Sequence, residues 1–544
     1  MPCVSGVCHV GATLTAMIPC TPESSGSETT SAPARRRAAG KRSKTGCRTC
    51  RARHKKCDES PGACNNCTST GRTCDGYDLH RLPREGRRKE QPLVKFTLPI
   101  SLANGLQWVK NSDEQRAFFY FQHHTIPAFV GWFDSSLWQK LVLQMSHAEP
   151  AVYHAVVALS AIHQDSDKRG MPLSRENLGS TWHRFALEQA GRSFHLINAR
   201  PASQDPRLWE VTLLCSLLYV ISELLRGQYE SAFNHLRGGI CILKQLGAHK
   251  QLEPATSKTM VDQSLVEAFA HLDLQSPQFG VEGPLLCMDE QDHPQPRKEK
   301  FLVFRTLAEA RQALDRLMNT VLRFTNGSWG SSHDEIASDY GIRYKSQLSL
   351  CMRVEEFAQA FNSFRNQASL TPKEQRGADL IYLHQRTATL ALQICLLDGN
   401  EPVLDQYTPE FENILSLANK IMYTFPERPS VCLDMGIIPS LFLVATACLD
   451  YKVRWKAIEA LRAWPHREGP WDSNLCAQMA VETMNLERTN NFNMYGEQTR
   501  FGDPEEPSLR RVFVTVAPDQ RQARLSYVVG HAEHEQWFDL DVSL

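Results

Sequence analysis

The stretch that decides the organisation of the chain is GCRTCRARHKKCDESPGACNNCTSTGRTCDGY, residues 46–77. It contains the unit C-x2-C-x6-C twice, and its six cysteines are Cys47, Cys50, Cys57, Cys64, Cys67 and Cys74. A C-x2-C pair turns the chain so that two thiolates reach one metal ion, and Zn²⁺ prefers four such ligands in a tetrahedron. The spacing therefore predicts a zinc-binding module.

The number of cysteines indicates how many Zn²⁺ ions the module can bind. Six thiolates are too many for one zinc and two short of the eight that two separate zincs need. The deficit closes if two sulfurs each bridge both ions, and the symmetry of the repeat favours the first cysteine of each unit, Cys47 and Cys64. Two Zn²⁺ would then be held by six cysteines, with Cys50 and Cys57 on one ion and Cys67 and Cys74 on the other. Two alternatives stay open: a disulfide knot, which needs an oxidising compartment and a secretory signal, and a single-zinc fold with spare cysteines.

The cysteine spacing and the basic first unit resemble the fungal Zn2Cys6 (binuclear cluster, C6 finger) transcription regulators. The resemblance implies a nuclear, zinc-dependent protein that binds double-stranded DNA at CGG-type half-sites and regulates genes transcribed by RNA polymerase II. Softer patches also resemble the large helical regulatory domain of that family, in residues 120–123, 133–135, 147–159, 229–232 and 235–239. The arrangement is similar to that of regulators of metabolic or secondary-metabolite genes, but target genes and the sign of regulation are not given by the sequence.

The segment between Cys50 and Cys57 is predicted to contact DNA through Arg51, Arg53, His54, Lys55 and Lys56. Anchoring at both ends on one zinc favours a helix of under two turns with a cationic outer face, which suits a major groove. We expect Arg51 and Lys56 to hold phosphates.

The position that reads the base is unusual. In the family, the fourth residue after the second cysteine is usually a base-contacting Lys, and here it is His54. Imidazole can donate to guanine N7 or O6, but it has less reach and no permanent charge, so the exact base preference is undetermined. Arg53 and Lys55 are expected to share the contact. The second unit carries Arg72 as its one cation and is predicted to be structural.

The segments on either side of the cysteines differ in composition. Residues 1–34 are rich in Ser, Thr, Gly, Ala and Pro and are predicted to be disordered. Residues 35–45 are predicted to direct nuclear import and to contact the DNA backbone. The residues that would do this are Arg35, Arg36, Arg37, Lys41, Arg42 and Lys44. The alternative is a solvated basic tail without a specific role. Residues 78–111 are predicted to be a basic, Pro-containing linker without the heptad pattern of a dimerising coiled coil. The sequence therefore favours binding to a single DNA half-site, or dimerisation through the large domain, over a coiled-coil dimer. It does not fix the oligomeric state.

The formal net charge of the 544 residues is zero, but the charges are segregated. Residues 1–90 hold 17 Lys and Arg against 8 Asp and Glu, whereas the remaining residues hold 43 against 52. A basic head on an acidic body implies that the head alone meets a polyanion.

Residues 112–530 are predicted to be an all-α regulatory domain with a loop near 277–298, so the fold class is mostly α. Ser112 and Gln115 predict a capping box, and the apolar stretch from Arg207 to Arg226 predicts a buried central helix that ends at Gly227. The apolar run from Leu213 to Leu225 is too short and too polar for a membrane span, and the N-terminus has no secretory pattern. We therefore expect no membrane association.

Residues 531–544 mix acidic and aromatic side chains. They are expected to form a C-terminal helix docked on the domain, with a coactivator-binding activation segment as the alternative. The chain contains no Walker, H-E-x-x-H or G-x-S-x-G motif, so we do not expect an enzyme and assign no catalytic residue. The alternative function is a scaffold whose zinc module binds RNA or protein partners.

Overall fold

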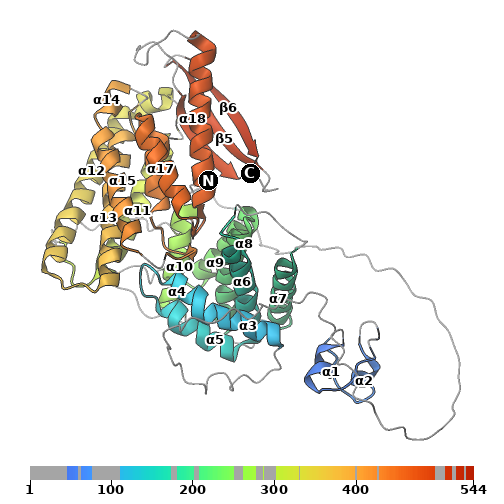
Figure 1. Ribbon diagram of the computed structural model, residues 1–544. Coiled ribbons are helices and arrows are strands. Elements are labelled where there is room, and N and C mark those ends of the chain that lie inside the picture. Colours follow the sequence, from blue (N-terminus) through green and yellow to red (C-terminus); the bar gives the residue numbers. More distant parts are fainter. Residues whose placement is uncertain are drawn as a thin grey trace, which may run out of the picture. The chain divides into compact units, whose positions relative to one another are not determined.

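The computed structural model describes two separate units of the chain (Figure 1), one within residues 1–78 and one within residues 79–544. The described residues are 46–58, 60, 63–75, 111–172, 180–200, 207–249, 261–276, 286, 302–329, 331, 333–397, 401–425, 428–495, 509–516, 522–531 and 534–543. The N-terminus predicted to be disordered (1–34), the basic arm (35–45), all but Asn111 of the linker at 78–111, and all but Leu286 of the loop at 277–298 lie outside them.

The small unit contains two short helices, α1 (Arg48–Ala52) and α2 (Asn65–Thr68). Each helix begins directly after the first cysteine of a C-x2-C-x6-C unit, because Cys47 and Cys64 are the residues that precede the first helical turns. Helices this short are not stable alone, so their stability must come from what the cysteines bind.

The first part of the large unit is helical, and it includes two short π-helices, labelled η. Its helices are α3 (Ser112–Tyr120), η2 (Phe121–Thr125), α4 (Ile126–Phe129), η3 (Leu137–Leu141), α5 (Val142–Ala148), α6 (Pro150–Lys168), α7 (Thr181–Asn198), α8 (Leu208–Arg226), α9 (Tyr229–Gln245) and α10 (Gln263–Gln275). The capping box of α3 is one residue earlier than predicted. Asn111 accepts from the backbone of Asp113 and Glu114, and the Glu114 carboxylate accepts from the Asn111 backbone N–H. The amide side chain of asparagine caps a helix as well as serine does.

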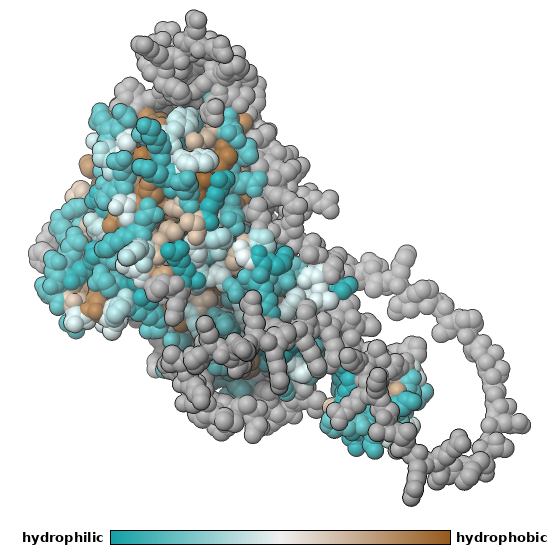
Figure 2. All heavy atoms as spheres, in the orientation of Figure 1, coloured by the Kyte–Doolittle hydropathy of each residue, from teal (hydrophilic) through white to brown (hydrophobic). Residues whose placement is uncertain are grey.

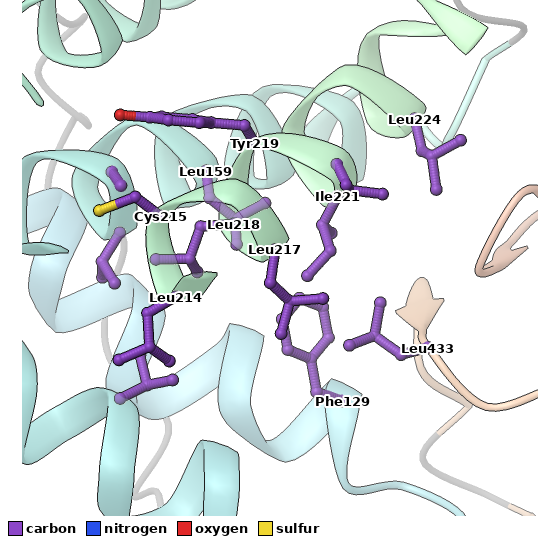
Figure 3. Close-up of a cluster of buried hydrophobic side chains, with 14 of the residues drawn as sticks. Phe129, Leu159, Leu214, Cys215, Leu217, Leu218, Tyr219, Ile221, Leu224 and Leu433 are labelled. Carbon is purple, nitrogen blue, oxygen red and sulfur yellow. The ribbon is translucent and has the colours of Figure 1, made fainter. Parts of the chain in front are cut away.

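Helix α8 is the centre of the first hydrophobic core, as predicted. It packs against α6 and α9 and ends at Gly227, which has the left-handed φ of 74°. Side chains of α8 gather with Phe129 of α4, Leu159 of α6 and Leu433 (Figure 3). The helix is long and apolar enough to cross a membrane, but 72% of that window is buried inside the protein. This burial identifies it as a core helix.

The second part of the large unit consists of α11 (Leu307–Trp329), α12 (His333–Gln367), α13 (Pro372–Ile394), α14 (Glu401–Asp405), α15 (Thr408–Tyr423), α16 (Ile438–Ala447), α17 (Tyr451–Ala463) and α18 (Ser473–Tyr495). A second core joins α13 and α15–α18 and includes Trp132 from the first part of the unit. A third core joins α11, α12 and α13. The predicted α-helical class is confirmed for this region.

A three-stranded sheet of two-residue strands joins the two parts. Its order is β1 (Val431–Cys432), β2 (Arg467–Glu468) and β3 (Trp471–Asp472), with β1 parallel and β3 antiparallel to β2. The buried Arg467 donates to Asp472 (3.0 Å) and to the carbonyl of Leu225 at the end of α8 (2.5 Å). The buried Glu468 accepts from three backbone N–H groups at the start of α16, at 2.8–3.1 Å. Adjacent buried charges thus tie a helix of the first core to one of the second.

The chain ends in an antiparallel sheet, with β4 (Leu509–Val516), β5 (Gln522–His531) and β6 (His534–Ser543) in that order. The expected C-terminal helix is therefore wrong, and the C-terminal part of the predicted all-α domain contains strands. In residues 538–542, FDLDV, apolar and acidic residues alternate with a period of two, which is the pattern of a strand. The mixed composition of the segment concealed this alternation.

Candidate metal centre and nucleic-acid interface

The sulfur atoms of the small unit are at the distances that a shared metal requires. Cys47 Sγ lies 3.4 Å from Cys64 Sγ and 3.8 Å from Cys67 Sγ, and Cys50 Sγ lies 3.5 Å from Cys64 Sγ. Tetrahedral zinc with Zn–S bonds of about 2.3 Å separates its sulfurs by about 3.8 Å, whereas a disulfide separates them by about 2.05 Å. The six described cysteines of the small unit are all free of disulfides. The geometry fits metal ligation and does not fit a disulfide knot.

The six sulfurs form two overlapping sets of four. One set is Cys47, Cys50, Cys57 and Cys64, and the other is Cys47, Cys64, Cys67 and Cys74. Within each set, the ligand atoms lie within 4.8 Å of one another. Cys47 and Cys64 belong to both sets, so each tetrahedron can be completed when these two residues are shared.

Backbone N–H groups point at three of the sulfurs. The N–H of Cys47 donates to Cys57 Sγ (3.2 Å), that of Cys64 donates to Cys74 Sγ (3.3 Å), and that of Cys50 donates to Cys47 Sγ (3.3 Å). Such hydrogen bonds favour thiolates, but burial raises the pKa of the Cys47, Cys50 and Cys64 thiols. A bound cation would keep this buried set of sulfurs deprotonated.

Two aspartates, Asp58 and Asp75, link the two C-x2-C-x6-C repeats of the small unit by hydrogen bonds. Asp58, directly after Cys57, accepts from the backbone of Asn65 (2.9 Å) and Asn66 (3.1 Å) at the start of α2. Hydrogen bonds from Ser60 and from these two N–H groups hold the pKa of the Asp58 carboxyl well below its usual range. Asp75, directly after Cys74, accepts from Thr49 Oγ1 of α1 (2.8 Å).

These bracing residues were not identified from the sequence. The signal that could have found them is the repetition of Cys-Asp at the end of both units, Cys57-Asp58 and Cys74-Asp75. Each aspartate extends the repeat by one residue, and its carboxylate contacts the helix of the other unit.

The segment after α1 differs from the predicted helix. Helix α1 ends at Ala52, and His54 has the left-handed φ of 55°. The N–H of His54 donates to the Arg51 carbonyl (3.1 Å) and that of Lys55 donates to the Cys50 carbonyl (2.9 Å), which are the two hydrogen bonds of a Schellman motif. The helix stops because this turn satisfies its last carbonyls, so the expectation that the helix runs from Arg51 to Lys56 is wrong.

The second unit repeats the same turn with a glycine. Gly71 stands four residues after Cys67, as His54 stands four after Cys50, and has a φ of 64°. Its N–H donates to Thr68, and the next N–H donates to Cys67, at 3.0–3.1 Å. Glycine is the residue that a left-handed position favours. The first C-x2-C-x6-C repeat therefore has a histidine, His54, at the left-handed position that the second repeat fills with glycine. The turn itself does not require an imidazole.

The predicted DNA-contacting residues gather on one short stretch. His54, Lys55 and Lys56 are exposed, and Arg51 and Arg53 are half-buried. The Lys56 carbonyl accepts a hydrogen bond from the Asn66 side chain (2.5 Å), which holds this stretch against the second C-x2-C-x6-C repeat. On the face drawn in Figure 2, the visible described residues of the small unit are mostly hydrophilic. The predicted backbone and import residues, Arg35, Arg36, Arg37, Lys41, Arg42 and Lys44, lie outside the described residues.

Both parts of the sequence match known families. Residues 45–83 match the fungal Zn(2)-Cys(6) binuclear cluster domain, and residues 117–464 match the fungal specific transcription factor domain. The chain belongs to the fungal Zn2Cys6 transcription regulators. Members of this family are DNA-binding transcription regulators and not enzymes, and the cluster domain implies that the cysteines of this regulator bind zinc.

Similar regulators are known from other fungi. The aspercryptin biosynthesis cluster-specific transcription regulator atnN of Emericella nidulans is 23% identical, over 90% of this chain and 94% of its own length. The transcription regulator lscL of Purpureocillium lilacinum is 25% identical, over 38% of this chain and 50% of its own. The transcriptional regulatory protein moc3 of Schizosaccharomyces pombe is 60% identical over 37 residues, which are 7% of each chain. No solved structure matches this regulator.

Proposed function

We propose that this chain is a nuclear regulator that holds two Zn²⁺ with six cysteines and binds specific DNA sequences upstream of RNA polymerase II genes. The observation that carries the proposal is the pair of overlapping sulfur sets. Cys47 and Cys64 bridge the two ions, Cys50 and Cys57 complete one tetrahedron, and Cys67 and Cys74 complete the other. The zinc contributes no catalysis and folds a segment that is too small to have a core.

The exposed stretch after α1 is the DNA-reading surface of this proposal. His54 contacts a guanine of a CGG-type half-site, with help from Arg53 and Lys55, and Arg51 and Lys56 hold phosphates. The exposure of His54, Lys55 and Lys56 supports this assignment. Residues 35–45 and the basic linker add contacts to the DNA backbone, and residues 35–45 direct nuclear import.

The target genes are proposed to encode steps of secondary metabolism. The support is atnN, which is named as a cluster-specific regulator of aspercryptin biosynthesis and aligns with nearly the whole of this chain. We propose that the regulator binds a single half-site or dimerises through its helical domain, and that coactivators bind the large unit.

Selection of bound sites from random duplexes with the full-length protein tests the proposal. We expect enrichment of sequences with a CGG triplet and loss of enrichment in the Cys50→Ala variant, which lacks one zinc ligand. Equal binding of scrambled duplexes, or tighter binding of RNA than of duplex DNA, would contradict it and favour a scaffold that binds RNA or protein.

A further inference from the structure

The large unit contains a cavity of about 330 Å³ between α10 and α11. Helix α10 contributes most of its buried side chains to the first core and Leu274 to the third, and α11 belongs to the third, so the cavity lies where the two cores meet. Its volume is at the lower end of the range for small-molecule sites, which is about 300–1,000 Å³. Phe129, Trp138, Leu274 and Leu433 supply an apolar part of the lining.

Arg311, a cation of the cavity lining, already has hydrogen-bond partners within the protein. Arg311 of α11 donates to Asp434 Oδ1 (2.5 Å) and to His271 Nε2 of α10 (2.9 Å), and its guanidinium lies over the Phe133 ring at 4.2 Å. Because His271 Nε2 accepts this hydrogen bond, the imidazole is neutral. Burial and the nearby Arg311 lower the pKa of His271 to about 3, which agrees with the neutral form. Arg311 is thus held in place and its charge is matched by Asp434.

Two carboxylates of the lining lack a comparable partner. Asp315 Oδ2 lies 3.5 Å from His271 Nε2 and 3.9 Å from Arg311 Nε, both longer than a good hydrogen bond. Glu267 Oε1 accepts from the amides of Gln263 (2.9 Å) and Gln312 (3.0 Å), which are neutral donors. Burial raises the pKa of Asp315 to about 6 and also raises that of Glu267. Both carboxylates would gain from a cation.

The other charged groups of the lining offset part of this negative charge. Among the described residues, the lining contains four carboxylates, of Asp134, Glu267, Asp315 and Asp434, and two guanidiniums, of Arg311 and Arg316. Asp134 is paired with Lys373 (2.6 Å), and Arg316 Nε donates to a carbonyl of its own helix (3.2 Å). The positive charge of Arg316 also acts on Asp315, so with Asp134 paired to Lys373 the described lining has an excess of one negative charge, shared by Glu267 and Asp315, beside its apolar surface.

We propose that this cavity binds a small organic amine, with its ammonium group between Asp315 and Glu267 and its apolar body against Phe129, Trp138, Leu274 and Leu433. The ligand contacts α10 and α11 at once, so binding stabilises the joint between the first and third cores. The site is separate from the zinc module, and the proposal does not depend on which DNA sequence the module reads.

Three probes of the same indole framework test the charge requirement on the purified full-length protein. Tryptamine carries an ammonium group, tryptophol a neutral hydroxyl and indole-3-acetate a carboxylate. In isothermal titration calorimetry at neutral pH, we expect tryptamine to bind at least about tenfold more tightly than tryptophol, the ratio expected for one charged hydrogen bond, and indole-3-acetate to bind more weakly than both.

Variants locate the binding in the cavity. Asp315→Asn and Glu267→Gln should each weaken tryptamine binding by about tenfold and leave tryptophol binding unchanged. Asp315 makes no short hydrogen bond to any residue that the structure describes, so its amide variant should fold, which the unchanged tryptophol affinity and melting temperature will show. Asp339→Asn, on the exposed surface of α12, is the matched control and should change neither affinity. Equal affinity for the three probes, no binding of tryptamine, or unchanged binding in both carboxylate variants would overturn the proposal, whatever the result of DNA binding.

Discussion

Replacing His54 by glycine separates the reading of DNA from the folding of the zinc module. His54 occupies a left-handed turn, and the equivalent turn of the second unit contains Gly71. The change relieves a backbone cost of about 1 kcal/mol, and the extra freedom of glycine in the unfolded chain offsets this by about 0.5–1 kcal/mol. We therefore expect zinc content and melting temperature to stay close to those of the unmodified protein.

The effect on DNA should be larger. A bidentate side-chain contact with a base contributes about 1–3 kcal/mol of discrimination, and the single hydrogen bond of an imidazole is expected at the lower end, about 1 kcal/mol or about fivefold in relative affinity. Fluorescence anisotropy with a selected duplex, in competition with the same duplex altered at the guanine that His54 reads, measures this ratio. His54→Gly should lower this ratio, and the discrimination that remains is the share of Arg53 and Lys55.

The repeat supplies a matched control for this experiment. Gly71→His places an imidazole at the equivalent turn of the second unit, where it should lower stability by about 1 kcal/mol and leave the discrimination ratio unchanged. The reasoning is refuted if His54→Gly keeps the full ratio, because His54 then reads no base. It is also refuted if His54→Gly loses zinc, because the imidazole then has a structural role.

Three further predictions concern a phosphate contact, a buried carboxylate and a buried imidazole. Lys56→Gln should weaken binding to all duplexes alike and reduce the slope of log K against log salt by about 0.9 in anisotropy titrations, and an unchanged slope would exclude a phosphate contact. Glu468→Ala leaves three buried N–H groups of α16 without their acceptor and should lower the free energy of unfolding in urea by about 3–5 kcal/mol, whereas a loss below about 1 kcal/mol would contradict its role. Burial lowers the pKa of His163 to about 4, so the unfolded state, with a His pKa of about 6.5, binds more protons in between. Stability should fall as pH decreases from about 6.5 to about 4, by about 1.4 kcal/mol per pH unit from this residue, and His163→Gln should remove that part of the slope in melting experiments.

The parts of the fold that were predicted from the sequence depend on local patterns. The cysteine spacing predicts the module because each ligand pair is only three residues apart. The buried helix α8 is visible because its apolar stretch ends at Gly227, and the end of a helix is a local event. The α-helical class of the large unit has the same basis.

The features that were missed have two physical causes. The basic residues around His54 and the mixed residues 534–543 have compositions that favour helices, but the chain forms a turn at the first and a strand at the second. The contacts of Arg467 with Leu225 and of Asp58 with Asn65, and the facing of α10 and α11 around Asp315, join residues that the sequence does not place together. Periodicity within one element carries no information on such pairings.

The central claim is that six cysteines hold two metal ions and thereby form the DNA-reading surface. Zinc per chain, measured by elemental analysis on the purified full-length protein together with a titration of free thiols, tests it most directly. We expect two Zn²⁺ per chain, with the six cluster thiols becoming reactive and specific DNA binding lost when a chelator removes the metal. One zinc per chain, disulfides among Cys47, Cys50, Cys57, Cys64, Cys67 and Cys74, or full DNA binding without metal would contradict the account.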